Sequence, residues 1–312
     1  MTNISTEARA TEAARTDWTA LAVMVGTPLA FASNAAFGRV AVESVNPFTL
    51  AFLRWLPVTL ILLPFAWHAL ATHREALREH WRLTLFMGFL GQFICGGIFY
   101  LALTMTTAAN GILIYSSVPA MIVLIERIFL GRALVHRQLV GIAMASVGIV
   151  YIMTRGSWHE LVAFRFNLGD AIVLGTSLSW AVYSILLRRP VFAALPNVGV
   201  LALFAMCGAA LLLPAAAVEI AATGKFPVQL DQWRSIAAIV LISSITAFLG
   251  YQFGVRRLGA AVASAFMYLL PVYGIFLAWF LVGERIYAFH YIGTALVLAG
   301  VVLASMKAKK PA

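Results

Sequence analysis

The chain has 312 residues, of which 62% are hydrophobic and only 11% are charged. A soluble domain has about 45–50% apolar and about 25% charged residues, and too much of its surface stays in water to hide such an apolar excess. This composition excludes a soluble globular domain, a disordered chain and a disulfide scaffold. The net charge of +10 comes from basic residues between the apolar runs, which is a membrane pattern and not a nucleic-acid-binding patch.

An apolar run of about 20 residues is long enough to cross a bilayer as a helix. The sequence contains ten such runs, at 18–38, 47–67, 83–103, 107–129, 135–154, 169–188, 197–219, 235–255, 260–282 and 286–306. No gap between them is long enough for a separate soluble domain. We therefore predict an all-α integral membrane protein with ten transmembrane helices.

Lysine and arginine are distributed unequally between the two sides of these spans. Fifteen fall on the side that holds both chain ends and the second, fourth, sixth and eighth gaps, and six fall on the other side. Because connections rich in Lys and Arg stay in the cytoplasm, both termini are predicted to be cytoplasmic. This distribution also favours an even number of spans.

The two halves of the chain resemble each other. A shift of 152 residues superimposes Pro119 on Pro271, Gly141 on Gly293 and Gly148 on Gly300. Since each half has five spans, an odd number, the second half must enter the membrane from the opposite side. We therefore predict a 5+5 inverted-topology repeat, an architecture typical of secondary transporters that bind substrate between the halves.

This repeat divides the chain into five predicted segments. They are a mobile polar tail at 1–17, a first five-helix repeat at 18–154, a loop at 155–168, a second five-helix repeat at 169–306 and a basic cytoplasmic tail at 307–312. The tail at 1–17 lacks the basic cluster of a signal peptide, so no cleavage is expected there.

Both halves carry residues that resemble the EamA family of the drug/metabolite transporter superfamily, with the greatest similarity to aromatic amino acid exporters of the YddG type. The residues that carry the resemblance are Ser33-Asn34, Pro47, Arg54 and Pro119 in the first half, and Gly169-Asp170, Trp180, Ala260, Pro271, Gly283-Glu284, Gly293 and Gly300 in the second. The resemblance implies ten helices, a central cavity walled mainly by spans three, four, eight and nine, and export of small metabolites across the bacterial inner membrane.

Arg54 is a charge within a span. It lies seven residues into the second run, roughly 10 Å below the membrane surface. A guanidinium at that depth costs several kcal/mol unless it is paired or hydrated. Arg54 is therefore interpreted either as a group that binds a substrate carboxylate or as a structural residue that bonds carbonyls of a neighbouring helix. No Asp, Glu or His occupies a span centre, and Asp170 is expected to N-cap span six.

Neutral polar and aromatic residues form one face of several spans, which predicts a mostly apolar cavity suited to a zwitterion with an apolar side chain. The predicted lining residues are Gln92, Phe99 and Tyr100 in span three, Tyr115 and Ser116 in span four, Ser244, Phe248, Tyr251 and Gln252 in span eight, and Ser264 and Tyr268 in span nine, with Asn34 and Trp180 closing the cavity from spans one and six. Alternatively, some of these side chains only form hydrogen bonds between helices.

Proline and glycine mark two further features of the repeat. Pro119 and Pro271 each remove a hydrogen bond within a span and are interpreted as hinges or as fixed kinks. Gly141, Gly148, Gly293 and Gly300 place small residues on one face of spans five and ten, which favours close helix packing within the chain or against a second protomer.

The pattern as a whole predicts a secondary transporter that exports small metabolites, with aromatic or other apolar amino acids as the leading substrate, by alternating access. A channel or facilitator for small neutral solutes is the alternative, and a membrane-embedded enzyme is a weaker one, because no nucleophile–base pair, metal cluster or carboxylate pair is recognisable. We expect no metal, cofactor or nucleic-acid partner. The internal repeat makes a monomer sufficient.

Overall fold

The computed structural model describes residues 17–42, 45–106, 111, 114–133, 135–157, 159, 162, 166–282, 285 and 287–306, without the side chains of 34–42, 278, 281 and 282. These residues form helices and short connections and contain no strand. The predicted mobile tail at 1–17, apart from Asp17, and the predicted basic tail at 307–312 lie outside the described residues. The predicted loop at 155–168 is described only in part.

The helices follow one another along the whole chain. They are α2 (Trp18–Val42), α3 (Pro47–Thr72), α4 (Arg74–Glu79), α5 (Trp81–Gly88), η1 (Phe89–Ile98), α6 (Phe99–Leu103), α8 (Val118–Leu130), α9 (His136–Met153), α11 (Leu168–Leu186), α12 (Pro190–Ala193), α13 (Asn197–Thr223), α14 (Leu230–Ala238), η2 (Ile239–Thr246), α15 (Ala247–Leu258), α16 (Ala260–Ala265), η3 (Phe266–Tyr268), α17 (Leu269–Val282) and α18 (Ala288–Ser305).

Eight helical segments among the described residues are long and apolar enough to cross a membrane. They correspond to the predicted spans two, three and five to ten. The first predicted span is the helix α2, whose apolar part is the shorter segment Trp18–Ser33. In the fourth, the described helix α8 has only 13 residues, and residues 107–110, 112 and 113 lie outside the described part.

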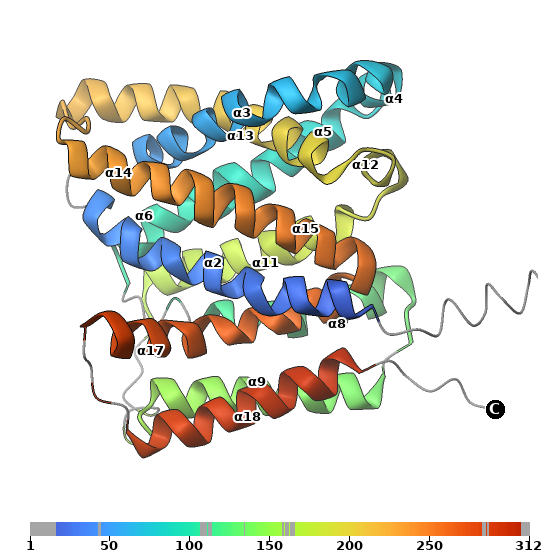
Figure 1. Cartoon of the computed structure of the whole chain (residues 1–312), viewed down its shortest axis with the longest axis vertical. Helices are drawn as coiled ribbons and strands as arrows, with labels where there is room; N and C mark the ends of the chain where they lie inside the picture. The colour runs from blue at the N-terminus through green and yellow to red at the C-terminus, as the bar shows by residue number, and fades with distance from the viewer. Residues whose placement is uncertain are drawn as a thin grey trace, which may run out of the picture.

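The helices lie roughly parallel or antiparallel in one bundle (Figure 1). The pair α3 and α13 forms one edge, and the pair α9 and α18 forms the other. Between these edges lie α2, α5, α6, α8, α11, α14, α15 and α17. The start of α2 and the end of α18 lie at the same end of the bundle, which we call the terminal end.

Two contacts involve residues at the terminal end. Arg257, in the last turn of α15, forms an ion pair with Asp17 at 3.3 Å, and Arg137 donates a hydrogen bond of 2.7 Å to the carbonyl oxygen of Met306. The basic connections after α8 and α15 therefore lie on the same side as both ends of the described bundle. This is the grouping that the Lys and Arg distribution predicted.

The pair α9 and α18 is held by glycines that cross at van der Waals contact. A Cβ atom on Gly141 would lie 2.6 Å from the carbonyl oxygen of Gly300, and a Cβ on Gly148 would lie 2.8 Å from that of Gly293. Under the 152-residue shift, Gly141 corresponds to Gly293 and Gly148 corresponds to Gly300. Gly141 therefore contacts the counterpart of Gly148, and Gly148 contacts the counterpart of Gly141. Such an exchange is a property of contacts across a two-fold axis.

Irregular helix turns occur at matching places in the two halves. The third span contains the wide π-helical segment η1, and the eighth contains η2, about 150 residues later. The fourth span is interrupted by turn residues Ser116 and Ser117, and the ninth contains the 3₁₀ turn η3. Irregular turns of this kind are often found at functional sites.

The prolines lie just after these breaks. Pro119 is in the first turn of α8, and Pro271 is the third residue of α17. A proline in a first turn removes no intrahelical hydrogen bond, because the N–H groups there have no partner. Pro119 therefore starts the second part of a broken span and removes no helical hydrogen bond. Pro271 instead lies inside the continuous helical segment Ala260–Leu277, just after η3, where a proline has no N–H to donate to the preceding turn. The interpretation of both prolines as hinges or fixed kinks stays a prediction.

The start of α11 differs in detail from the prediction. Asn167 is the N-cap, and its side chain accepts a hydrogen bond of 3.0 Å from the backbone nitrogen of Asp170. Asp170 occupies the third helical position and accepts a 2.9 Å bond from the Asn167 nitrogen. Asp170 therefore completes a capping box instead of being the cap itself, because the N-cap lies three residues earlier than expected.

Replacing Asn167 with alanine is expected to lower the free energy of unfolding by about 1 kcal/mol, because the Asp170 nitrogen loses its acceptor. Thermal unfolding of the purified protein in detergent measures this as a lower midpoint. Asn46→Ala is the matched control, since Asn46 is the N-cap residue of α3 but its side chain forms no capping bond and donates an exposed hydrogen bond to Thr223. Equal midpoints for the two variants would contradict the role of the capping box.

Candidate functional site

Six aromatic side chains from α2, α3, α11 and α15 meet inside the bundle. We call Phe31, Trp55, Trp180, Tyr183, Phe248 and Tyr251 the aromatic cluster. Trp180 lies at its centre, with its ring centroid 6.0 Å from Phe31, 5.4 Å from Tyr183 and 5.0 Å from Tyr251. All of these except Phe31 are buried. The cluster forms an apolar surface with indole and phenol groups at its margins.

Arg54 lies against this cluster and is 5% exposed. Its Nε donates to the Ser244 hydroxyl at 2.6 Å, and its two terminal nitrogens donate to the Tyr100 hydroxyl at 3.0 Å and to the Ser243 carbonyl at 3.1 Å. The guanidinium carbon lies 4.9 Å from the centroid of the Trp55 ring and 5.7 Å from that of Phe248. Neutral dipoles and ring faces therefore surround the charge.

No carboxylate of the described residues forms an ion pair with Arg54. Ion pairs among the described residues include Arg132–Glu126, Arg234–Asp231 and Arg257–Asp17, all toward the ends of helices. A buried cation balanced only by dipoles favours the arrival of an anion, because a carboxylate forms short, charge-assisted hydrogen bonds with a guanidinium.

The segment η2 supplies two of the three acceptors for Arg54. In this segment the Ser244 hydroxyl donates at 2.9 Å to the carbonyl of Ile239, five residues before it, as the wider helix turn allows. The neighbouring hydroxyl of Ser243 is within 3.0 Å of that of Ser33 on α2. The residue pattern predicted a polar position at Ser244 but missed Ser243 and both wide turns, for which no sequence signal was recognised.

The structure brings together part of the predicted lining. Tyr100, Trp180, Ser244, Phe248 and Tyr251 contact Arg54 or one another. Trp55 and Phe31 join them and were not predicted.

Phe99 and Tyr115 form a second ring contact beside this group. Their centroids are 6.0 Å apart, and the Phe99 ring lies 6.4 Å from that of Tyr100. Ser116 lies half-buried in the turn that follows Tyr115. The side chain of Asn34 lies outside the described residues.

Of the other predicted lining residues, Gln252 reaches only the margin of the aromatic cluster, and Gln92, Ser264 and Tyr268 have contacts outside it. Gln92 packs so closely against Gly208 of α13 that a Cβ atom added to this glycine would lie 2.2 Å from the Cβ of Gln92. Gln252 donates a hydrogen bond of 3.2 Å to the Tyr183 hydroxyl. The Tyr268 hydroxyl is 2.8 Å from that of Ser146 on α9. Gln252 and Tyr268 thus form hydrogen bonds between helices, as the alternative interpretation expected. Ser264 bonds the carbonyl of Ala261 in its own helix, and the side-chain amide of Gln92 is buried without a hydrogen bond to the described residues.

A search for related proteins adds the decisive observation. The profile of the EamA-like transporter family matches the chain twice, over residues 18–154 and 167–306. The chain belongs to the EamA-like transporter family. Membership and the transporter names of its relatives identify it as a membrane transporter of this family rather than an enzyme.

Three similar proteins have names that describe transporters or an exporter. "Uncharacterized transporter YyaM" of Bacillus subtilis is 28% identical over 74% of this chain and 75% of its own length. "Uncharacterized inner membrane transporter YedA" of Escherichia coli is 25% identical over 86% and 84%. A "Probable terminal-alkyne amino-acid exporter" of Streptantibioticus cattleyicolor is 26% identical over 63% of each chain.

A solved structure has the same fold. It is titled only "Crystal structure of protein", is 23% identical, covers 90% of this chain and 95% of its own, and superimposes with a TM-score of 0.72. At this identity the likeness describes the helix arrangement and not the substrate.

Proposed function

We propose that this EamA-family protein exports amino acids with apolar side chains, with aromatic amino acids as the preferred substrates. The observation that carries the proposal is the buried guanidinium of Arg54 beside the aromatic cluster. A guanidinium pairs with the substrate carboxylate, and the rings accept an apolar or aromatic side chain. The name of the Streptantibioticus relative, an amino-acid exporter, supports the same class of substrate.

The substrate lies, in this proposal, against one group of residues near the middle of the bundle. Arg54, Tyr100 and Ser244 form its polar part, and Trp180, Phe248 and Tyr251 form its apolar part. Phe99, Tyr115 and Ser116 line the path toward the end of the bundle opposite the terminal end.

Transport in this proposal uses ten spans in a 5+5 inverted repeat, with the halves at 18–154 and 169–306. The exchanged glycine contacts of α9 and α18 and the matching irregular turns support two halves of similar structure. Halves that can exchange conformations give two states of similar energy that open to opposite sides, which is alternating access. Pro119 and Pro271, which follow the breaks in spans four and nine, are the proposed hinges. A monomer is sufficient for this cycle.

The proposed location is the bacterial inner membrane, with both termini in the cytoplasm. The name of the YedA relative, an inner membrane transporter, supports this membrane. The basic connections at the terminal end support the orientation through the positive-inside rule.

Counterflow in liposomes tests the transport proposal. Vesicles that contain purified protein and are preloaded with unlabelled phenylalanine are expected to accumulate labelled phenylalanine, tryptophan and tyrosine transiently, with saturation and mutual competition. An imposed proton gradient, compared with none, shows whether protons drive the flux.

Other outcomes would contradict parts of the proposal. Flux that neither saturates nor responds to competitors would indicate the channel or facilitator instead. Chemical conversion of the added amino acid would indicate an enzyme. Absence of flux for all three amino acids, from protein that is folded by thermal unfolding, would rule out the proposed substrates.

A further inference from the structure

A second polar site lies at the terminal end of the bundle, far along the helices from Arg54. It is an open cavity of about 290 Å³ between the end of α8, the connection to α9, the end of α11 and the turn from α15 to α16. The cavity thus lies between the two halves of the chain. Its volume is close to the lower limit of about 300 Å³ for small-molecule pockets, so it suits a single small metabolite.

The wall of this cavity combines apolar side chains with polar groups, and the polar groups form somewhat more of its surface. Its apolar lining residues are Val123, Ala133, Val135, Leu258, Ala260, Ala261 and Val262. Valine, leucine and alanine side chains of this kind accept the hydrocarbon part of a ligand and give no polar contact to it.

The charged residues at the rim are three arginines and one glutamate, namely Arg132, Arg188, Arg257 and Glu126. Two of the arginines already have carboxylate partners. Arg132 pairs with Glu126 at 2.5 Å, and Arg257 pairs with Asp17 at 3.3 Å. Within the part of the chain that the structure describes, Arg188 has neither an ion pair nor a hydrogen bond from its side chain. The cavity therefore contains an excess of positive charge that is centred on Arg188.

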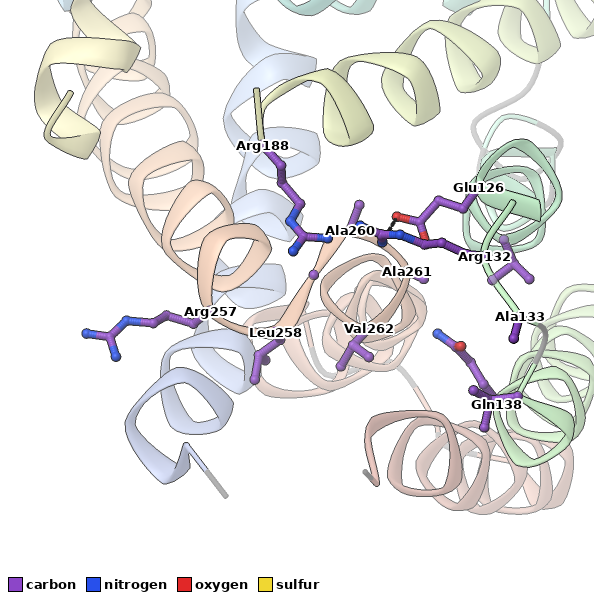
Figure 2. A pocket seen from close by; sticks show the side chains of 13 residues that line it. Glu126, Arg132, Ala133, Gln138, Arg188, Arg257, Leu258, Ala260, Ala261 and Val262 are labelled. Carbon is purple, nitrogen blue, oxygen red and sulfur yellow. Dashed lines mark hydrogen bonds and ion pairs between the residues drawn. The ribbon is translucent and has the colours of Figure 1, made fainter. Parts of the chain in front are cut away.

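Figure 2 shows how these side chains are directed. Arg188 extends from the end of α11 toward Ala260, while Arg132 and Glu126 approach Ala260 from the opposite side. Arg257 points away from the cavity. Arg188 and the bonded Arg132 are thus the two guanidinium groups that face the apolar wall.

We propose that this cavity is a docking site for the carboxylate of a small apolar amino acid, held by Arg188 before the molecule moves toward Arg54. The inference rests on the proposed export of amino acids and adds the place where the substrate first binds. A carboxylate at Arg188 forms charge-assisted hydrogen bonds with a cation whose side chain bonds no other residue in the described part of the chain. The apolar wall then contacts the side chain of the amino acid.

Chemical labelling tests binding at this site without any transport. Phenylglyoxal modifies accessible arginines, and mass spectrometry of purified, folded protein measures the modification of Arg188 and of its neighbour Arg189. Phenylalanine and phenylacetate, which carry a carboxylate, are expected to protect Arg188 and not Arg189. Phenylalaninamide, which lacks the carboxylate, is expected to protect neither.

Transport kinetics test the role of the site in the same pathway. Arg188→Gln is expected to raise the KM for phenylalanine about tenfold with little change in kcat, because it removes a contact made on binding. The wild-type KM is expected to rise with salt, and that of the variant to change less, because ions screen an exposed charge. Arg189→Gln is the matched control and should behave like the wild-type protein.

The outcomes separate this inference from the proposed function. Failure of carboxylates to protect Arg188 overturns the docking site even where phenylalanine is transported. An Arg188→Gln variant with unchanged KM and salt response also overturns it. If carboxylates protect Arg188 in a protein that transports no amino acid, the result supports the carboxylate site and contradicts the proposed export of amino acids.

Discussion

Arg54→Gln is expected to reduce phenylalanine export by about tenfold to a hundredfold, because hydrogen bonds to a charged group contribute about 1.5–3 kcal/mol. Glutamine keeps polar atoms near the Ser244 and Tyr100 hydroxyls but loses the charge that pairs with a carboxylate. Arg54→Lys keeps the charge without the planar fork of donors and should retain partial activity. Initial rates in liposomes, normalised to folded protein, measure these effects.

Arg234→Gln is the matched control for Arg54. The Arg234 side chain is 69% exposed and pairs with Asp231 outside the aromatic cluster, so its loss should leave transport unchanged. Wild-type export by a folded Arg54→Gln protein would show that Arg54 is a structural residue that bonds Ser243 and Ser244. If Arg54→Gln cannot be purified in folded form, Tyr100→Phe and Ser244→Ala test the site instead. Each of these variants keeps the charge of Arg54 and removes one of its hydrogen-bond acceptors.

The second large effect is expected where α9 crosses α18. Gly141→Ala introduces a methyl group 2.6 Å from the backbone of both Gly300 and Ala304, and these backbone atoms cannot rotate away. Separating two packed helices to accommodate it is expected to destabilise the protein by about 1–3 kcal/mol. Gly141→Leu should be more severe and prevent recovery of folded protein. Thermal unfolding in detergent measures the difference.

Gly175→Ala on α11 is the control for this substitution. A Cβ at Gly175 meets no atom within 4 Å, and alanine favours a helix over glycine by roughly 0.5–1 kcal/mol, so this variant should be as stable as the wild type or more so. Equal unfolding midpoints for Gly141→Ala and Gly175→Ala would contradict the close glycine crossing.

Most of the helix boundaries could be predicted from the sequence. In lipid, backbone groups must bond within their own helix, so length and hydropathy alone indicate where a span lies. The predicted runs at 47–67 and 83–103 correspond to the segments Pro47–Thr72 and Trp81–Leu103. The glycine contacts were also predictable, because only glycine at matching positions of two spans allows such close packing.

The direction of individual side chains was less predictable. Tyr268 and Tyr251 both belong to polar faces of their spans, yet Tyr268 bonds Ser146 on α9, while Tyr251 joins Trp180 in the aromatic cluster. Periodicity assigns a residue to a face of its own helix. It does not say which neighbouring helix that face meets, because this depends on how far each helix is rotated and tilted.

The sequence by itself determined that the chain is a helical membrane protein with two similar halves and a basic side, because hydropathy, spacing and charge are local properties that lipid selects directly. Only the tertiary structure decided that Arg54 meets Ser243, Ser244 and Tyr100, and that Arg188 faces a cavity and bonds none of the described residues through its side chain. These contacts join residues up to 190 positions apart. They exist only after helix packing has fixed the rotation of each helix and the width of the turns at η1 and η2.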